Sequence, residues 1–360
     1  MSRTTTIGNM TGFDGMVFGA RRAFLHWSSQ LRPIGGAGAR HAAGLATATL
    51  ASALLFGACP ALAQDLTFLD PAGPIARSEL DHFWRIALIS SVAVLPVLLL
   101  LPLIVWRYRA GGKGAFRPNW DYSRQLEITM WGVPIVIVAI LSVQLVRNTL
   151  ELDPYRPLAS DVPPLQVDVV ALNWKWLFLL PEYGIASVDS LTIPVDRPVE
   201  FRLTSDSTMQ SFMVPALAGQ IYVMPGMETR QNLLADRQGL FVGRNTQFNG
   251  PGFAGQSFAL QVTDTAGFEG WVSRLRQDGP VMDEAAYALL ATPGTAKDLS
   301  GMRWLALDSG GAFGFAAYPD GLFDRVRQRY MTQLPVGPAE QPGSPNYAPE
   351  GARQKDSQHD

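Results

Sequence analysis

The stretch Ile86–Trp106 reads IALISSVAVLPVLLLLPLIVW and holds 21 residues without a charged side chain. A helix of this length is about 31 Å long, which matches the hydrocarbon thickness of a bilayer. A second uncharged run of 19 residues, ITMWGVPIVIVAILSVQLV, follows at Ile128–Val146. Trp84 and Trp106 lie at the two ends of the first run, and their rings favour the membrane–water interface. The two runs predict transmembrane helices at residues 84–106 and 126–148.

The charges around these runs predict the orientation of the helices. The segment 107–125 carries five basic residues and one acidic residue: Arg107, Arg109, Lys113, Arg117, Arg124 and Asp121. The segment 64–83 instead carries four acidic residues and one arginine: Asp65, Asp70, Glu79, Asp81 and Arg77. Because an excess of Lys and Arg marks the cytoplasmic side, 107–125 is predicted to be a cytoplasmic loop. The lead 64–83 and everything after residue 148 are then predicted to be exported.

Residues 1–63 have the pattern of an export signal. Basic residues precede the apolar, small-residue run 42–58, and Ala61-Leu62-Ala63 supplies an A-x-A cleavage pattern. A third membrane helix is the alternative interpretation of the apolar run. Cys59 leaves two interpretations open. The sequence Phe56-Gly57-Ala58-Cys59 loosely resembles a lipobox, in which Cys59 is lipidated, whereas cleavage after Ala63 would remove this cysteine.

The composition excludes several function classes. Charged residues make up 17% of the chain and hydrophobic residues 47%, which suits membrane segments attached to a polar domain. The net charge of -2 argues against a nucleic-acid partner bound through bulk electrostatics. The stretch 83–358 contains neither cysteine nor histidine. A Cys/His zinc site, a Ser-His-Asp triad and an intrachain disulfide are therefore excluded there.

The exported part is predicted to be mostly β-structure. Residues 153–164 hold four prolines and are typical of a linker. Six β-rich runs follow, separated by Gly, Pro, Asp and Asn clusters: Leu165–Val170, Leu191–Ile193, Val199–Leu203, Gln220–Val223, Thr229–Leu234 and Phe258–Val262. Short strands at this spacing indicate a sandwich or barrel, and the aromatic run 173–180 is expected to be buried.

The pattern becomes helical from Thr265 onward. Phe268, Trp271 and Leu275 share one face of a predicted helix, and further helices are expected at Asp283–Ala291 and Asp320–Leu334. Residues 335–360 are rich in proline and polar side chains, and this composition predicts a disordered tail.

Two motifs in the exported part resemble subunit II of haem-copper respiratory oxidases. Thr204-Ser205-Asp206 followed by Gln210-Ser211-Phe212-Met213-Val214-Pro215 resembles T-S-x-D-V-x-H-S-F-x-V-P of cytochrome c oxidase, with Gln210 in place of His. Residues 243–250 resemble G-Q-C-x-E-x-C-G. In that match Asn245 and Asn249 replace the cysteines, Gln247 replaces Glu, and the later His and Met ligands align with Gln256 and Ala259. The resemblance implies that the side-chain ligands of the binuclear copper centre are absent.

In lacking these ligands, the chain resembles the quinol-oxidase branch of the family, the cytochrome bo type. Further branch-like segments include Leu69-Asp70-Pro71, Trp106-Arg107-Tyr108-Arg109, Trp174-Lys175-Trp176 and Gly219-Gln220-Ile221-Tyr222. The resemblance implies a cupredoxin-like Greek-key barrel at 149–276 and an aromatic-rich helical arm at 277–334. The expected fold class is thus a membrane protein with a two-helix hairpin and an exported all-β domain.

The same resemblance implies a role and a location. The chain is expected to be a non-catalytic subunit without a cofactor, while subunit I carries the haems, the catalytic copper and the quinol site. Its expected partners are subunit I, the small subunits of the oxidase and the lipid bilayer. The expected location is the bacterial inner membrane, multi-pass, with the large C-terminal domain in the periplasm. A stand-alone membrane-anchored binding or assembly protein is the alternative.

Individual residues allow further expectations. Glu127 matches the family's acid before Trp-x-x-Pro, here Trp131 and Pro134, and the resemblance implies that it stands at the mouth of a proton channel. An ordinary carboxylate at a helix N-terminus is the alternative. Four methionines are the remaining soft ligands, and packing is favoured over a copper site for Met209, Met213, Met224 and Met227. Trp174 and Trp176 are expected to be core residues.

Overall fold

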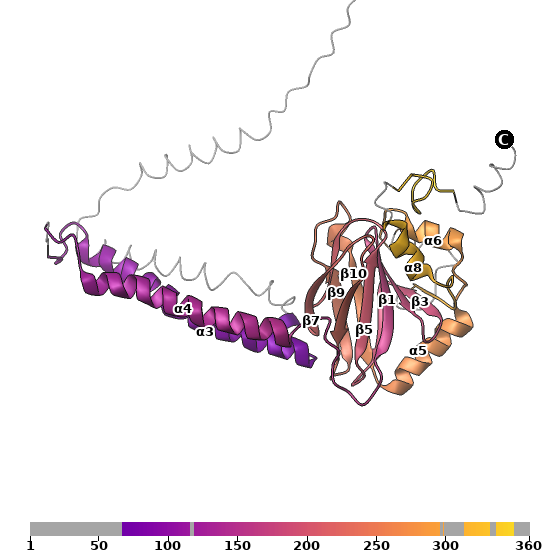
Figure 1. The fold of residues 1–360 in the computed structure, drawn as a ribbon, viewed down its shortest axis with the longest axis horizontal. Coiled ribbons are helices and arrows are strands. Elements are labelled where there is room, and N and C mark those ends of the chain that lie inside the picture. Colours follow the sequence, from indigo (N-terminus) through magenta and orange to yellow (C-terminus); the bar gives the residue numbers. More distant parts are fainter. Residues whose placement is uncertain (1–66, 116–118, 296–297, 299–312, 332–335, 349–360) are drawn as a thin grey trace, which may run out of the picture. The chain divides into compact units, whose positions relative to one another are not determined.

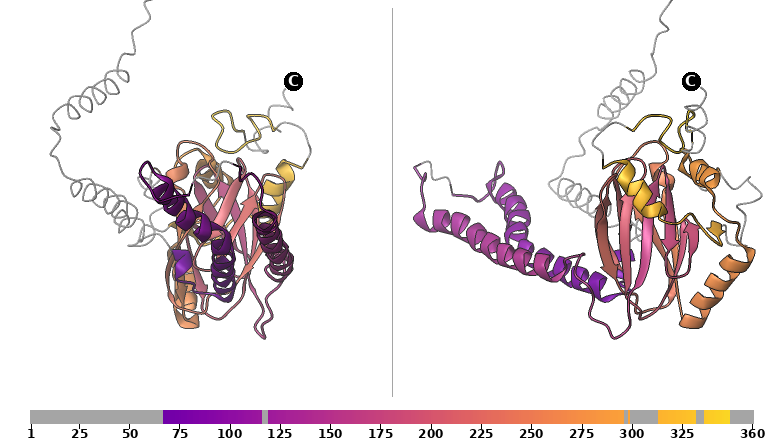
Figure 2. Two further views of the ribbon diagram at one scale, coloured as in Figure 1. Left: turned by 90° about the vertical axis from the view of Figure 1, so that its left-hand side faces the viewer. Right: turned by 45° about the vertical axis from the view of Figure 1, so that its right-hand side comes forward.

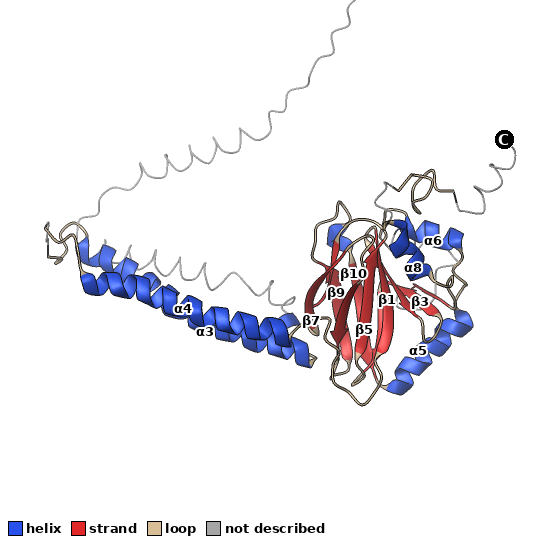
Figure 3. Cartoon of the chain, viewed as in Figure 1, coloured by secondary structure: helices blue, strands red, loops and turns tan. Residues whose placement is uncertain are grey.

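The computed structural model describes residues 67–115, 119–295, 298, 313–331 and 336–348. The chain divides into two units, 1–65 and 66–360, and the description below concerns the second. The export signal and Cys59 lie outside the described residues, as do 116–118, 296–297, 299–312, 332–335 and 349–360. The second unit contains two long helices and a β-domain (Figure 3).

Helices α3 (Pro74–Tyr108) and α4 (Arg124–Glu151) are both long and apolar enough to cross a membrane. The side chains of His82 and Asn148 contact each other between them. Pro96, Pro102 and Pro134 lie inside the helices. Helix α3 begins ten residues before the predicted span 84–106, because Pro74 occupies the first turn, where its missing N–H costs no hydrogen bond.

The first turns of α3 and the preceding segment are bound to the β-domain. The backbone N–H groups of Ala72 and Ala76 donate to the carbonyls of Ala216 and Leu217, at 2.7 and 3.2 Å. The Glu79 carboxylate accepts a hydrogen bond from the Gly219 N–H at 3.0 Å. The lead therefore forms part of the fold of the domain, and Ala72 belongs to its buried core.

The β-domain is a sandwich of two sheets. Sheet A has the strand order β11-β3-β2-β1-β5-β8, with β1 (Leu165–Leu172), β2 (Lys175–Leu180), β3 (Ile185–Val188), β5 (Val199–Ser205), β8 (Thr229–Leu233) and β11 (Phe313–Phe315). Sheet B has the order β4-β10-β9-β6-β7, with β4 (Ser190–Pro194), β6 (Gln210–Val214), β7 (Ala218–Val223), β9 (Gly239–Asn245) and β10 (Ser257–Thr263). The pairs β1–β5 and β4–β10 are parallel, so the chain crosses between the sheets.

The six β-rich runs predicted from the sequence are all strands, with bounds within two residues of those observed. Five of the described strands were not predicted: β2, β3, β6, β9 and β11. The sequences of β3, β6 and β9 are IASV, QSFMV and GLFVGRN. They carry small or polar residues that weaken a β pattern, and tertiary pairing decides their conformation.

The buried apolar residues form two clusters. One fills the space between the two sheets. The second covers the outer face of sheet A and includes Tyr287, Leu290, Leu322, Phe323 and Val326. These five residues belong to helices α6 (Glu284–Ala291) and α8 (Leu322–Arg329), which stand beyond β1 and β3 in Figure 1. Because both faces of sheet A are covered, every residue of β2 is buried. The expected burial of the run 173–180 is thus confirmed for 175–180, whereas Asn173 and Trp174 are only partly buried.

Helix α5 (Thr265–Asp278) lies along the margin of the sandwich, against β3 and β4 (Figure 2). The Asp264 side chain caps it by accepting from the Gly267 N–H at 2.8 Å. Phe268, Trp271 and Leu275 are buried, which confirms the predicted apolar face.

Helix α6 confirms the helix predicted at Asp283–Ala291. It begins at Glu284, because the Asp283 side chain caps it by accepting from the Ala286 N–H at 2.8 Å. Helix α8 is shorter than the predicted 320–334. It starts only after Gly321, whose φ of 66° is left-handed, and it ends at Arg329. Residues 336–348, within the segment whose composition predicts disorder, form a series of turns. There the backbone of Gly343 approaches Ala291 so closely that a Cβ would meet its carbonyl oxygen at 2.3 Å.

Candidate functional site: a buried amide network

Four amide side chains converge at one end of sheet B. Gln210 is the first residue of β6, and Asn245 is the last residue of β9. Asn249 lies in the loop that follows, and Gln256 immediately precedes β10. Strands β6 and β10 flank β9 in the sheet, which brings residues 46 positions apart into contact. We call Gln210, Asn245, Asn249 and Gln256 the amide network.

The four side chains bind one another directly. The Gln256 Nε2 group donates to Gln210 Oε1. Gln256 Oε1 accepts two hydrogen bonds, from Asn245 Nδ2 and Asn249 Nδ2, both at 2.9 Å. Gln210, Asn245 and Gln256 are at most 4% exposed, so their polar groups depend on these partners.

The amide network also holds the backbone around it. Asn245 Oδ1 accepts from the N–H groups of Ser211 and Gln247, both at 2.9 Å. Gln210 Nε2 donates to the Leu172 carbonyl at 3.0 Å and to Ser207 Oγ at 2.8 Å. The network therefore joins sheet B to the end of β1 in sheet A.

The structure thus brings together four of the six residues aligned with copper ligands. Gln247 contributes its backbone N–H, while Ala259 lies within β10 and donates its N–H to the Asp189 carbonyl at 2.9 Å. The methyl side chain of Ala259 offers no ligand atom.

The two tryptophans have different environments. Trp176 is fully buried and packs edge-on against Phe212 and Phe258, which confirms it as a core residue. Trp174 is only partly buried, contrary to the expectation, because its φ of 64° turns it out of β1 and β2. Its ring covers the 249–252 turn, where its Nε1 donates to the Asn249 carbonyl at 3.3 Å. A Cβ on Gly252 would lie 2.2 Å from that ring.

The donor set of the network does not fit a binuclear copper centre. Such a centre requires bridging thiolates and imidazoles, whereas amide groups are weak, hard ligands that are here engaged with one another. The four methionines are at least partly exposed: Met209, Met213, Met224 and Met227. Among the described residues, no group of three or more His, Cys, Asp or Glu side chains could hold a metal ion.

A buried carboxylate beside the network was not predicted from the sequence. Asp206 precedes Ser207, the partner of Gln210, and forms an ion pair with Arg329 at the end of α8. The hydroxyl groups of Tyr287 and Tyr330 donate to the same carboxylate, at 2.5 and 2.7 Å. Burial and the nearby carboxylate raise the pKa of both tyrosines, so both remain protonated donors. The arm is thereby fastened to the β5–β6 loop.

A buried lysine fastens the arm at a second point. Lys175 Nζ donates to the carbonyls of Thr292 and Gly294, at 2.8 and 2.6 Å, just after α6. Burial lowers the pKa of Lys175 to about 8. Burial also raises the pKa of Asp189 to about 7, and this carboxylate accepts from the Trp176 N–H at 2.7 Å. The segment Trp174-Lys175-Trp176 does not reveal this role of Lys175, because the two carbonyls of the arm lie 117 and 119 residues away.

Glu127 lies far along the chain from the amide network, in the first turn of α4. Its side chain is exposed, and its backbone N–H donates to the Ser123 carbonyl at 3.0 Å. The carboxylate stands at a helix N-terminus, one residue before the uncharged run that begins at Ile128.

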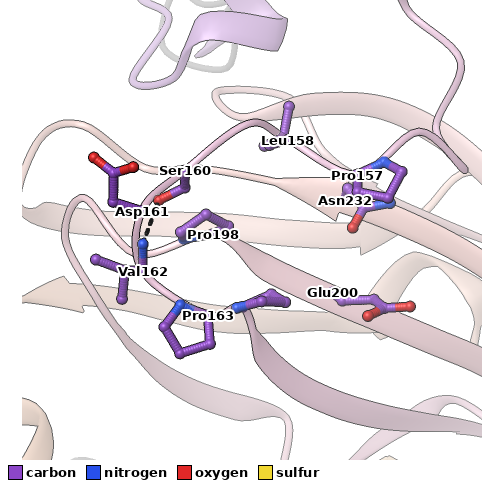
Figure 4. A pocket seen from close by; sticks show the side chains of 10 residues that line it. Pro157, Leu158, Ser160, Asp161, Val162, Pro163, Pro198, Glu200 and Asn232 are labelled. Atoms are coloured by element: carbon purple, nitrogen blue, oxygen red, sulfur yellow. Dashed lines mark hydrogen bonds between the residues drawn. The ribbon is translucent and has the colours of Figure 1, made fainter.

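A pocket of about 350 Å³ lies under the linker that follows α4 (Figure 4). Linker residues such as Pro157, Asp161 and Pro163 form one side, and Pro198, Glu200 and Asn232 of the sandwich form the other. The Ser160 hydroxyl accepts from the Val162 N–H at 3.1 Å and shapes the linker turn. The rest of the lining consists mainly of prolines and two carboxylates. We interpret this pocket as the joint between linker and sandwich.

Two long apolar helices followed by a two-sheet sandwich define a membrane-anchored, cupredoxin-like protein. The family model described as cytochrome c oxidase subunit II, periplasmic domain, matches residues 167–261. The cytochrome bo(3) ubiquinol oxidase subunit 2 of Pseudomonas putida is 41% identical over 246 residues, which is 66% of this chain and 78% of that protein.

The ubiquinol oxidase subunit 2 of Acetobacter aceti is 38% identical over 247 residues, covering 68% of this chain and 79% of that one. The crystal structure of the periplasmic domain of cytochrome oxidase subunit II from Bradyrhizobium japonicum is 22% identical. It covers 33% of this chain and 95% of that chain with a TM-score of 0.30. The chain belongs to the subunit 2 family of ubiquinol oxidases, and it is a subunit of a respiratory quinol oxidase.

Proposed function

We propose that this chain is a copper-free, non-catalytic subunit 2 of a proton-pumping ubiquinol oxidase. It docks on and supports subunit I, which oxidises quinol and reduces oxygen to water. The observation that supports this proposal is the amide network. Gln210, Asn245, Asn249 and Gln256 occupy the aligned ligand positions and satisfy one another through hydrogen bonds instead of holding copper.

Chemistry explains why such a subunit can dispense with copper. Quinol is soluble in the membrane and reaches subunit I laterally, so no exported electron relay is required. The haems, the catalytic copper and the quinol site then belong to subunit I. The small subunits of the oxidase are further proposed partners.

The proposed location is the bacterial inner membrane, with both helices spanning it and the β-domain in the periplasm. The five-to-one excess of basic over acidic residues in the 107–125 segment supports a cytoplasmic loop. Single cysteines at two exposed positions test this in a Cys59→Ala background. In intact spheroplasts, a cysteine at Ser273 of α5 should react with an impermeant thiol reagent, and one at Ala110 should not. The reverse labelling would overturn the topology.

We further propose that Glu127 receives protons from the cytoplasm for subunit I. A carboxylate at the exposed first turn of a membrane helix can stay in contact with water while it faces a partner helix. Its exposure and its place one residue before the uncharged run support this role.

One purification tests the proposed function. The full chain carries an affinity tag at its C-terminus, is expressed in its host and is purified from membranes in mild detergent. The expected product contains haem, oxidises quinol with oxygen and carries no copper on the separated subunit 2. A tagged chain that is folded but free of haem would instead favour the stand-alone binding or assembly protein.

A further inference from the structure

The two outer faces of the sandwich are covered differently. Helices α6 and α8 cover the outer face of sheet A, as described above. In the described part of the chain, α5 contacts sheet B at β4 and the adjoining β10, and α3 contacts it at the opposite edge, β7. Between these edges, Leu240 and Val242 of β9 are 66% and 42% exposed. In Figure 1, β9 and β10 lie on the side away from α6 and α8.

Strand register identifies the residues of this open face. Leu240 and Val242 alternate with the buried Phe241 and Gly243, so they point away from the core. Met213 of β6 pairs with Arg244 of β9 and therefore shares their face. On β7, Tyr222 is 46% exposed and pairs with Ser211. Leu240, Val242, Met213, Arg244, Gln220 and Tyr222 thus mark what we call the outer face of sheet B.

The composition of sheet B is that of an interface. None of its five strands, SLTIP, QSFMV, AGQIYV, GLFVGRN and SFALQVT, contains Asp, Glu or Lys. Sheet A, in contrast, carries Asp168, Lys175 and Glu200 in its strands. Protein interfaces are enriched in aromatic residues, Met and Arg and are depleted of Lys, Glu and Asp. A sheet face in contact with water is not expected to lack Lys, Glu and Asp together.

We propose that the outer face of sheet B is the surface that docks on the exported part of subunit I. This inference rests on the proposed function, because it names the surface through which that docking takes place. The occupant follows from the continuity between this sheet and the membrane hairpin. Edge strand β7 is bound by α3 through Glu79 and Gly219, only seven residues before the uncharged run begins at Ile86. A membrane partner packed against α3 and α4 therefore emerges beside β7, where sheet B begins.

Leu240→Glu and Val281→Glu form a matched pair for the test. The two side chains are 66% and 67% exposed, but Val281 lies in the arm and not on sheet B. Each variant of the tagged full chain is purified from host membranes, and haem is measured per chain. We expect the haem that co-purifies with each chain to decrease at least tenfold in Leu240→Glu and to stay at the parental amount in Val281→Glu. Thermal unfolding of the isolated chains should be the same for both variants.

A photo-crosslinking amino acid at position 240 of the otherwise native chain provides a second measurement, which does not depend on how the glutamate variant folds. The crosslinked product should have the mass of this chain plus subunit I. A product containing two copies of this chain would overturn the proposal in favour of a homodimer. If Leu240→Glu retains haem and no crosslink to subunit I forms, the surface is wrong while the proposed function stands. If the parental chain itself carries no haem, the proposed function has failed.

Discussion

The carboxylate of Asp206 forms an ion pair with the guanidinium of Arg329, which lies 123 residues later in the chain. The side chain of Asp206 has no exposed surface, and that of Arg329 is 19% exposed. Tyr287 and Tyr330 complete the shell of donors around the carboxylate. The next residue, Ser207, accepts from Gln210 Nε2, so the arm and the amide network bind adjacent residues of the β5–β6 loop.

Asp206→Asn should detach the arm from the sandwich. The change leaves the Arg329 charge buried without its partner, and breaking a buried pair in this way costs about 3–5 kcal/mol. Limited proteolysis of the full chain in detergent should cut the variant rapidly between α5 and α6, where the parental chain resists. Asp324→Asn is the control, because its pair with Arg327 is half exposed and worth about 0–1 kcal/mol. Equal protection of the Asp206 variant and the parental chain would show that the pair does not hold the arm.

Lys175 should make stability depend on pH in the alkaline range. Burial lowers its pKa to about 8, whereas the ordinary value is 10.5. Between these values the unfolded chain binds a proton that the folded chain does not, so stability should increase with pH, by up to about 3 kcal/mol. The measurement is the denaturation midpoint of the full chain from pH 7 to 10.5. Lys175→Met should remove the increase, and an unchanged slope in that variant would contradict the assignment.

Asp189 should act in the opposite direction at lower pH. Its pKa is raised to about 7 from 3.8, so the folded chain binds a proton that the unfolded chain releases in this range. Stability should therefore decrease as the pH rises from about 4 to 7. Asp189→Asn should remove this decrease in stability and leave the increase at alkaline pH unchanged. If the variant loses stability between pH 4 and 7 as the parental chain does, another group is responsible.

Gln256→Ala should disrupt the amide network without any metal being involved. It leaves Asn245, Asn249 and Gln210 each with an unpaired group, at a cost on the order of 1–3 kcal/mol for each buried group. Hydrogen exchange should become faster at the Ser211 N–H, which Asn245 holds. Gln261→Ala, on the exposed side of β10, is the matched control and should change stability by less than about 0.5 kcal/mol. Indistinguishable exchange in the two variants would show that the network contributes no stability.

Glu127→Gln should slow quinol-driven oxygen consumption per haem in the assembled oxidase, because proton transfer needs an ionisable group. Glu127→Asp should retain more activity, since the acid remains and moves by one methylene. Haem content should be unchanged in both variants, because a contact with the helix dipole at an exposed end is worth only about 0.3–1 kcal/mol. A parental rate in Glu127→Gln would exclude the proton role, and a loss of haem would identify a docking contact.

The predictable part of the fold depends on patterns that are local in the chain. Uncharged runs of 21 and 19 residues are sufficient to predict α3 and α4, because an apolar helix needs only its own length to span a bilayer. The helical pattern from Thr265 and the run 283–291 predict α5 and α6, since residues on one helix face are only three or four positions apart. The polar strand β6 could not be predicted, because its conformation is imposed by pairing with β7 and β9.

The candidate site also has a part that the sequence predicts and a part that it does not. The family resemblance identified four residues of the site: Gln210, Asn245, Asn249 and Gln256. Their spacing in the sequence does not show that Gln256 accepts from both asparagines while donating to Gln210. Asp206 and Lys175 carry no local signal of their function, since their partners in the arm lie more than 80 residues away.

The sequence by itself determined that two helices can span a membrane, that an exported β-domain follows them and that the aligned copper ligands are missing. Residue identity and the periodicity of polar and apolar side chains carry these properties, and both are local. Only the tertiary structure decided that the amides satisfy one another, that Asp206 and Lys175 hold the arm, and that the described residues leave the outer face of sheet B uncovered. The physical reason is that a buried polar group is stable only with a partner in three dimensions, and folding brings that partner from any distance along the chain.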